Sequence, residues 1–320
     1  MKLLLTGSSG WLGRHLAPRL EAIGHKVIGL DIAPGDHTDI VGTVADRTLI
    51  DKTFRGHGIE AVIHAGALHK PDIVRYPNSA FVDVNVTGTL NLLEAAVQAG
   101  HDRFIFTSTT SLMISETVRA GREGGAEQAF WLDEEFGPLK PRNIYGVTKI
   151  SAEHLCRLFH KLHGINVAVL RTGRFFPEDD DTLIMPSGPN LKANEFLNRR
   201  LTVEDAAEAH VVALNGIADL GFETFILSAP TPFGRTDCAQ LIANAPAVIA
   251  RYYPEAKALY DKKGWILPDH IDRIYDAGKA ERLLGFRSKT DFASILAALA
   301  EEREPPFHHD PHYLSPKEAL

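Results

Sequence analysis

Tyr145 and Lys149 are the residues whose types and spacing most directly suggest chemistry. They lie four positions apart, and residues at i and i+4 share one face of a helix, so the phenol and the ammonium group can converge on one ligand. A nearby ammonium group favours the phenolate, which lowers the pKa of a tyrosine and makes it a usable base near neutral pH. The pair therefore predicts a catalytic base, Tyr145, supported by a cation, Lys149.

A glycine-rich loop at residues 6–13 (Thr-Gly-Ser-Ser-Gly-Trp-Leu-Gly) joins an apolar strand to a helix. Gly7 permits the tight turn, Gly10 lets the backbone approach a pyrophosphate, and Gly13 lets the helix pack closely on the strand. The N-terminus of the helix offers unpaired N–H groups and a positive dipole end to phosphate. The loop predicts a dinucleotide site.

Asp31 indicates which dinucleotide binds. It lies at the tip of the second expected strand, Lys26–Leu30, 18 residues after Gly13. An acid at this place accepts hydrogen bonds from ribose hydroxyls and repels a 2′-phosphate, which favours NAD over NADP.

These residues need a scaffold, and the first 170 residues alternate short apolar runs with helical patterns. Further strands are expected at Lys2–Thr6, Ile40–Val44, Ala61–His64, Arg103–Thr107 and Val167–Arg171, with helices at Trp11–Ile23, Asn78–Ala99 and Ile144–His163. This alternation predicts an α/β protein with a Rossmann-type, doubly wound parallel sheet. We expect residues 1–174 to form the NAD-binding domain, with 201–230 returning to it.

The remaining residues, 175–200 and 231–320, are expected to form a small substrate lobe and a C-terminal tail. Phe175–Arg200 is rich in Pro, Gly, Asn and Asp and predicts a loop, and Pro305–Leu320 predicts an extended surface segment. Helices are expected at Leu201–Asn215, Asp237–Tyr253, Ala277–Leu284 and Asp291–Glu301, and a strand at Thr224–Ser228. Arg119–Glu127 predicts a mobile loop that covers the substrate.

Composition narrows the partners and the setting. The net charge of −7 argues against nucleic acid, and no apolar run is long enough to span a membrane. The two cysteines, Cys156 and Cys238, lie far apart, which fits a reduced cytoplasmic setting without disulfides or a zinc site. The segment His308–His312 lacks the geometry of a closed metal site, so no metal is expected.

Together these motifs resemble the extended short-chain dehydrogenase/reductase family, which includes nucleotide-sugar epimerases and dehydratases. The resemblance covers residues 1–230, and it rests on Thr6–Gly13, Val44–Arg47, His64–Ala67, Asn85–Ala96, Leu170-Arg171 and Val203–Ala206. It implies that NAD is bound by Gly7, Gly10, Trp11, Leu12, Gly13, Asp31, Asp46, Ala65, Gly66, Ala67, Asn85, Thr107, Tyr145 and Lys149. Asp46 is the residue that would contact adenine, and Asn85 is the one that would order the site.

The resemblance also implies hydride transfer to the nicotinamide. Tyr145 would remove the proton of a substrate hydroxyl, Lys149 would bind the nicotinamide ribose, and Thr109 would hydrogen-bond the substrate oxygen. Ser108 and Ser111 stay open as alternatives to Thr109, and Ser111 is a candidate substrate contact.

The sequence departs from the nucleotide-sugar members of the family. Arg174 stands where those members usually have an asparagine, and the Arg-x-Gly-Asp stretch that holds their diphosphate is missing from Lys263–Arg273. These departures favour a smaller substrate, such as a free sugar or a sugar acid. Arg174 is expected to pair either with a substrate carboxylate or phosphate or with one of Glu178–Asp181.

The predicted function is an NAD-dependent sugar epimerase or oxidoreductase, with a sugar, a sugar acid or a nucleotide sugar as substrate. A net aldose or uronate dehydrogenase is one alternative, and a non-catalytic NAD-sensing regulator on the same fold is another. The resemblance further implies a homodimer formed through the helices at Asn78–Ala99 and Ile144–His163.

Overall fold

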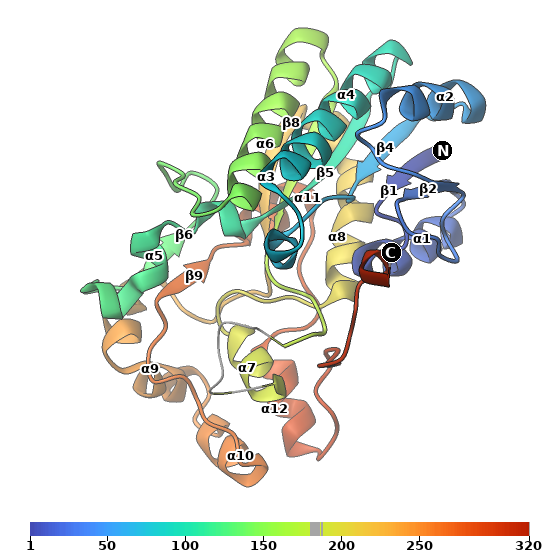
Figure 1. The fold of residues 1–320 in the computed structure, drawn as a ribbon. Helices are drawn as coiled ribbons and strands as arrows, with labels where there is room; N and C mark the ends of the chain where they lie inside the picture. The colour runs from blue at the N-terminus through green and yellow to red at the C-terminus, as the bar shows by residue number, and fades with distance from the viewer. Residues whose placement is uncertain (180–185, 187, 320) are drawn as a thin grey trace.

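The computed structural model describes residues 1–179, 186 and 188–319, and its centre is a seven-stranded sheet (Figure 1). The strands run in the order β3-β2-β1-β4-β5-β7-β8, and every neighbouring pair is parallel. Their bounds are β1 Lys2–Thr6, β2 Lys26–Asp31, β3 Ile40–Val41, β4 Ala61–His64, β5 Arg103–Thr109, β7 Asn166–Thr172 and β8 Phe222–Leu227. The strand order runs outward from β1 in both directions, which confirms the predicted doubly wound α/β Rossmann-type fold.

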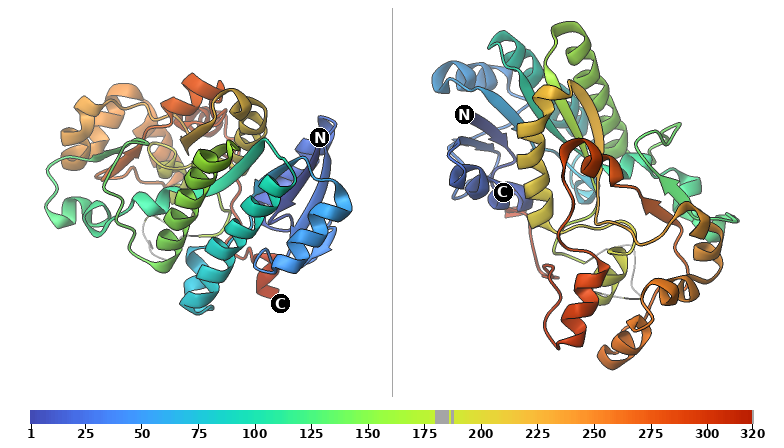
Figure 2. Two further views of the ribbon diagram at one scale, coloured as in Figure 1. Left: turned by 90° about the horizontal axis from the view of Figure 1, so that it is seen from above. Right: turned by 180° about the vertical axis from the view of Figure 1, so that it is seen from behind.

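Helices cover both faces of the sheet because its strand residues are apolar on both sides. Leu3 and Leu5 pack toward α1 and α8, whereas Leu4 packs toward α2, α4 and α6. The bounds of these helices are α1 Trp11–Ala22, α2 Arg47–His57, α4 Gly88–Gln98, α6 Ile144–His163 and α8 Val203–Gly216, and α11 Gly278–Leu284 lies beside β8 (Figure 2). Helix α2 was not predicted from the sequence, and β3, Ile40–Val41, is three residues shorter than the expected Ile40–Val44.

The helix expected at Asn78–Ala99 is interrupted by a wider turn. It consists of α3 Asn78–Phe81, the π-helical turn η2 Val82–Thr87 and α4. A π-helical turn accommodates one extra residue and often occurs at functional sites. Here it contains Asn85.

A second group of elements packs around its own apolar cluster below the carboxyl ends of the sheet strands (Figure 1). It contains the parallel pair β6 Phe130–Leu132 and β9 Arg273–Tyr275, with helices α7 Gly188–Glu195, α9 Cys238–Tyr252, α10 Ala256–Lys263 and α12 Phe292–Ala300. The loop expected at Phe175–Arg200 is therefore wrong over α7; residues 180–185 and 187 lie outside the described part of the chain. Helix α7 lacks an apolar stripe and is tied in by tertiary hydrogen bonds, such as Asn190 Nδ2 to Ile266 O at 3.0 Å, which composition does not reveal.

Two other expectations are also corrected. Most of residues 119–127 are not an open loop but belong to the helical turns α5 Glu116–Ala120 and η4 Gly121–Gly124. These turns are held beside β9 because Arg122 N donates to Oδ1 of Asp272, the residue before β9, at 2.8 Å. The tail is not merely extended: it runs back to α1 and ends in the short turn η7 Pro316–Ala319 (Figure 1). The other short turns are η1 Lys70–Val74, η3 Thr110–Met113, η5 Ile217–Asp219 and η6 Arg235–Asp237. Among the described helices, none is long and apolar enough to cross a membrane.

Candidate active site

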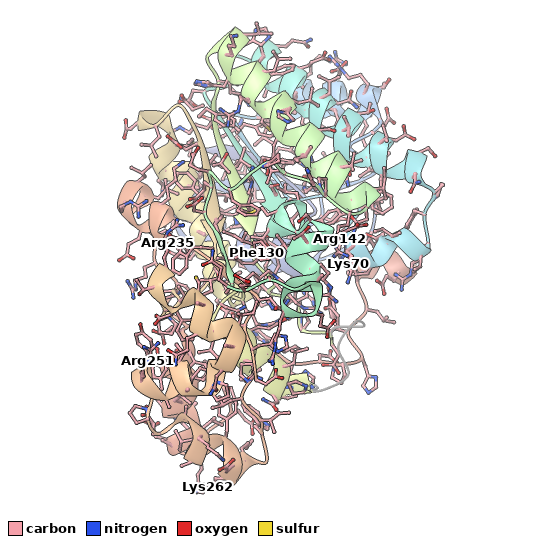
Figure 3. The ribbon with its side chains drawn as sticks, turned by 90° about the vertical axis from the view of Figure 1, so that its left-hand side faces the viewer. Lys70, Phe130, Arg142, Arg235, Arg251 and Lys262 are labelled. Carbon is pink, nitrogen blue, oxygen red and sulfur yellow. The ribbon has the colours of Figure 1, made fainter. Side chains whose placement is uncertain are left out.

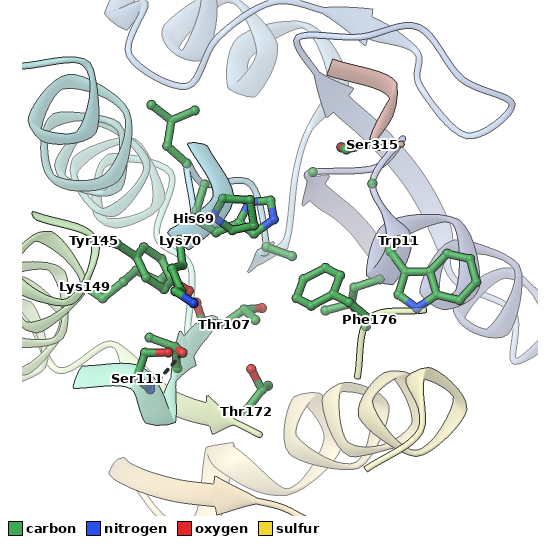
Figure 4. A pocket seen from close by; sticks show the side chains of 18 of the residues that line it. Trp11, His69, Lys70, Thr107, Ser111, Tyr145, Lys149, Thr172, Phe176 and Ser315 are labelled. Atoms are coloured by element: carbon green, nitrogen blue, oxygen red, sulfur yellow. Dashed lines mark hydrogen bonds between the residues drawn. The ribbon is translucent and has the colours of Figure 1, made fainter. Parts of the chain in front are cut away.

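A cavity of about 590 Å³ lies at the carboxyl ends of the sheet strands, where doubly wound folds bind their ligands (Figure 4). The glycine loop, the ends of β2, β4 and β5, the start of α6 and the C-terminal tail all contribute to its wall. Most of the predicted site residues line it: Gly7, Gly10, Trp11, Leu12, Asp31, Ala65, Gly66, Ala67, Thr107, Thr109, Ser111, Tyr145, Lys149 and Arg174. The predicted residues Gly13, Asp46 and Asn85 are not part of the wall.

The glycine loop has the close approaches that its sequence predicts. Gly7 has a φ of +75°, and a Cβ at this position would lie 2.7 Å from Gly66 N. A Cβ at Gly13 would lie 2.1 Å from Gly7 O, so a side chain there would push α1 away from the loop. Asp31 ends β2, and its carboxylate accepts hydrogen bonds from Ser9 N at 3.1 Å and Ala33 N at 3.2 Å, which ties it to the glycine loop.

Asp46 is exposed and caps α2, where its Oδ1 accepts a hydrogen bond from Leu49 N at 3.1 Å. The cavity wall nearest to it comes from Gly42, Thr43 and Val44. Capping uses one carboxylate oxygen and leaves the other available. The predicted contact of Asp46 with adenine stays a prediction.

Tyr145 lies in the first turn of α6, which begins after Asn143; the Asn143 side chain accepts a hydrogen bond from Gly146 N at 3.0 Å. Its phenol is buried, and burial raises the pKa of Tyr145 to about 12, while a hydrogen bond with Thr109 works in the opposite direction. The direction is opposite to the predicted one. Burial, Thr109 and Asp72 are the causes of this shift, and Lys149 is not one of them.

The Lys149 ammonium group is held by the end of β5. Nζ donates to Thr107 O at 2.6 Å and lies 4.3 Å from the centre of the Phe106 ring. Burial lowers the pKa of Lys149 to about 8, and the Glu153 carboxylate opposes this shift. Lys149 therefore lines the cavity one helical turn beyond Tyr145 (Figure 4).

The geometry favours Thr109 over its neighbours as the third residue of the site. Ser108 also lines the cavity, but its hydroxyl is committed to Glu153, since Oγ donates to Glu153 Oε1 at 2.6 Å. Thr109 Oγ1 accepts a hydrogen bond from Ser111 N at 3.1 Å and is the hydrogen-bonding neighbour of Tyr145. Ser111 lines the same wall, in the position expected of a substrate contact.

Sequence reasoning missed the role of Glu153, which continues the face of α6 defined by Tyr145 and Lys149. Besides Ser108, it pairs with Arg171, whose Nη2 lies 2.7 Å from Glu153 Oε2. Both side chains are buried. The i, i+4 spacing from Lys149 was the available signal, and the pair fixes the end of β5 against α6.

A buried relay of polar groups, also missed, fixes the strand ends. Gly66 N donates to Thr6 Oγ1, and the Thr6 hydroxyl contacts His64 Nδ1 at 2.7 Å. On the other side of the ring, His64 Nε2 contacts Thr89 Oγ1 at 3.0 Å, and the Thr89 hydroxyl donates to Asn85 O at 2.7 Å. Because the Thr89 proton goes to the carbonyl, the only consistent tautomer has a proton on His64 Nε2 and none on Nδ1. Burial lowers the pKa of His64 to about 3, so the ring is neutral.

Asn85 links this relay to the catalytic helix. Its Oδ1 accepts from Leu68 N at 2.9 Å, and its Nδ2 donates to Leu68 O at 2.9 Å and to Thr148 Oγ1 at 3.1 Å. Thr148 in turn donates to the carbonyls of Ile144 and Tyr145. Asn85 therefore acts on the site by positioning rather than by contact, in agreement with the expected ordering role.

Arg174 lines the cavity and is held by the segment that follows it. Its Nη2 donates to Glu178 O at 3.4 Å and to Asp179 O at 3.0 Å. These contacts anchor the guanidinium group to backbone carbonyls beside the site. Its predicted binding to a substrate anion stays a prediction.

A cluster of possible metal ligands lies beside Trp11, apart from the cavity. Within the described part of the chain, His15, Glu204 and His308 bring one ligand atom each to within 4.8 Å of one another. Glu204 and His308 are partly exposed, and His308 Nε2 lies 2.7 Å from Glu204 Oε1. The contact attaches the tail to α8, which sequence spacing could not indicate because the residues are about 100 positions or more apart.

Comparison with known proteins agrees with this arrangement. The family model described as the NAD dependent epimerase/dehydratase family matches residues 3–187. A UDP-glucose 4-epimerase of Lactobacillus helveticus is 30% identical over 94% of this chain and 96% of its own, and a uronate dehydrogenase of Pseudomonas syringae pv. tomato is 28% identical over 58% of this chain and 63% of its own.

A crystal structure of a UDP-glucose 4-epimerase from Thermotoga maritima, with UDP-glucose, has the same fold, with a TM-score of 0.65 and 21% identity over 94% of this chain and 98% of that one. The described wall residues fit the cofactor: the glycine loop packs so closely on Gly66 and on itself that no Cβ fits at Gly7 or Gly13, and the Asp31 carboxylate lines the same cavity. The chain belongs to the NAD dependent epimerase/dehydratase family, as an enzyme of the extended short-chain dehydrogenase/reductase type whose cofactor is NAD.

Proposed function

We propose that this enzyme oxidises a hydroxyl group of a sugar or sugar derivative, with Tyr145 as the base. The observation that carries the proposal is that Tyr145 and Thr109 reach the cavity from two different elements, α6 and β5, as hydrogen-bonding neighbours. Two hydroxyl groups so placed can hold one substrate oxygen between them. The relatives' substrates, UDP-glucose and a uronate, are carbohydrates, which supports the sugar class.

When bound, NAD supplies the acceptor for the hydride. The chain's residues bind, orient and move the proton. Thr109 holds the substrate oxygen, and Tyr145 takes its proton. Because burial raises the pKa of Tyr145 to about 12, the phenol needs a cation beside it before it can act near neutral pH. Lys149, one turn along α6, is the candidate cation within the chain.

The fate of the hydride separates the two outcomes of this chemistry. An epimerase returns it to the other face of the same substrate and keeps its cofactor, whereas a dehydrogenase releases NADH. Tail residues Tyr313, Leu314 and Ser315 form part of the cavity wall, so the tail restricts the exit of a bound cofactor. This observation favours cofactor retention, and we propose the epimerase-type cycle first and a net dehydrogenase second.

The test begins with the nucleotide released when freshly purified protein is denatured without added NAD. Near-stoichiometric NAD or NADH supports retention. Protein that is empty and then forms free NADH with aldoses or uronic acids supports the dehydrogenase. Tyr145→Phe is the control: it should bind NAD normally and lose at least about a hundredfold in turnover, as expected for removal of a general base. A wild type as inert as Tyr145→Phe across the panel would favour the regulator.

We also propose that the enzyme is a homodimer of the cytoplasm. Exposed apolar side chains on α6, among them Leu158 and Leu162, support an interface on that helix. Cys156 and Cys238 are both unpaired and buried, which agrees with a reducing compartment.

A further inference from the structure

The wall of the cavity nearest β9 contains a buried arginine whose charge has no carboxylate partner among the residues that the structure describes. Arg273 is 8% exposed, and its Nε has no hydrogen-bond partner. Within the described part of the chain no carboxylate forms an ion pair with it, and the Tyr275 side chain is the neighbour that favours its charged form. An arginine stays charged in a protein, and a buried charge without a counter-ion is costly, so the site is built to receive an anion.

Two further arginines line the same wall. Arg119 comes from α5, and its positive charge acts on both Arg273 and Arg142. Arg142 precedes the catalytic helix and is exposed, and its Nε donates to Ile114 O at 3.2 Å, which holds the side chain beside the segment that leads into α5 (Figure 3). Neither guanidinium group forms an ion pair with a described carboxylate. The charge of Arg119 repels those of Arg142 and Arg273, and the charge of Arg199 also acts on Arg273.

None of the described acids on this wall forms an ion pair with Arg119, Arg142 or Arg273, although the charge of Glu116 acts on Arg142. Glu195 pairs with Arg199 and Arg200, each at 2.8 Å, and Asp179 lies 3.6 Å from His309 Nδ1. Glu178 is half-buried, and desolvation raises its pKa. The excess positive charge at this end of the cavity is therefore left for a ligand.

We propose that Arg273, with Arg119 and Arg142, binds an oxyanion of the substrate. The inference rests on the proposed function, because it concerns the sugar whose hydroxyl faces Tyr145. Arg142 is three residues before Tyr145, so a substrate held at Tyr145 places its charged group within the arginine wall. A planar guanidinium group binds a carboxylate or a phosphate through two parallel hydrogen bonds. The substrate class is a sugar that carries a carboxylate or a phosphate.

The test measures charge preference separately from turnover. Sodium glucuronate, glucose 6-phosphate, UDP-glucose and neutral glucose are titrated by calorimetry into the NAD-saturated protein. We expect at least one charged probe to bind about thirtyfold more tightly than glucose, the change expected when a buried charge pair is completed. The glucuronate arm tests the carboxylate, and the other two arms test phosphate.

Arg273→Met keeps the length of the side chain and removes its charge, and it should abolish most of this preference. Arg119→Met, on the partly exposed rim, should reduce it several-fold and tests the proposal if the first variant does not fold. Arg287→Met is the control, because Arg287 is exposed and pairs with Glu281 at 3.0 Å away from the cavity. It should leave the preference unchanged.

Two results would overturn the proposal: a wild type that binds no charged probe more tightly than glucose, or a preference that survives in both Arg273→Met and Arg119→Met. A preference lost in these variants supports the site even if no probe yields NADH or an epimer. In that case the proposed function fails alone, and the anion site stands.

Discussion

Replacing Asn85 by alanine should separate positioning of the catalytic helix from contact with ligands. Asn85 is 2% exposed and satisfies both backbone groups of Leu68, which is itself 4% exposed. A buried backbone group that loses its partner costs about 1–3 kcal/mol, so the variant should lose about 2–6 kcal/mol of unfolding free energy. Guanidinium denaturation followed by tryptophan fluorescence measures this loss.

The same variant should also slow catalysis, because Asn85 Nδ2 holds Thr148, which lies between Tyr145 and Lys149 on α6. A shift of the catalytic helix by about 1 Å costs up to about a hundredfold in rate. We expect kcat to fall about ten- to a hundredfold, while Asn85 itself touches no ligand.

Asn190→Ala is a matched control. Asn190 makes the same pair of hydrogen bonds, to Ile266 N at 2.9 Å and Ile266 O at 3.0 Å. Ile266 is 51% exposed, so water can replace the lost partner, and the variant should lose less than about 1 kcal/mol with kcat unchanged. Equal losses of stability in the two variants, or an unchanged kcat in Asn85→Ala, would refute the reasoning.

Three further predictions concern pH, assembly and the tail. Burial lowers the pKa of His64 to about 3 and that of His210 to about 4. As the pH falls below about 6.5, these histidines are protonated in the unfolded chain but not in the folded protein, so each should remove about 2 kcal/mol of unfolding free energy at pH 5. The loss should appear as a lower denaturation midpoint at pH 5 than at pH 7. A midpoint that does not change between these pH values would contradict this. Leu162→Glu, at a side chain that is 61% exposed on α6, should convert a dimer into monomers in analytical ultracentrifugation without loss of fold, and a dimer that persists would move the interface elsewhere. Lys317→Ala removes the 2.5 Å contact between the tail and the buried carboxylate of Asp72; it should speed NADH release in stopped-flow fluorescence, and unchanged release would show that the tail does not retain the cofactor.

The cofactor half of the site was predictable because its signals are local. Gly7, Gly10 and Gly13 lie within seven positions of one another, and their roles depend only on the turn between one strand and one helix. Tyr145 and Lys149 are likewise separated by one helical turn. The strand–helix alternation was sufficient for the parallel sheet, since each unit is formed by consecutive segments.

The sequence was insufficient where one local pattern suits two roles. Asp46 follows an apolar segment, as an adenine-binding acid would, and the same residue also caps helix α2, which was not predicted. The shift expected in the pKa of Tyr145 failed for a related reason. Spacing places Lys149 near the phenol, but only the tertiary structure shows that its ammonium group points to Thr107 O.

The substrate half of the site could not be found by pattern because its charges meet only in the folded chain. Arg119, Arg142 and Arg273 come from segments more than 20 and more than 130 positions apart along the chain. From its local sequence alone, each of these arginines is expected to be exposed to solvent. Their convergence depends on β9 pairing with β6 and on the contact between Asp272 and the turn after α5. Members of a family that share the glycine loop and the Tyr/Lys pair can therefore differ in substrate charge through a few residues on β9 and α5. In this chain those residues select an anion.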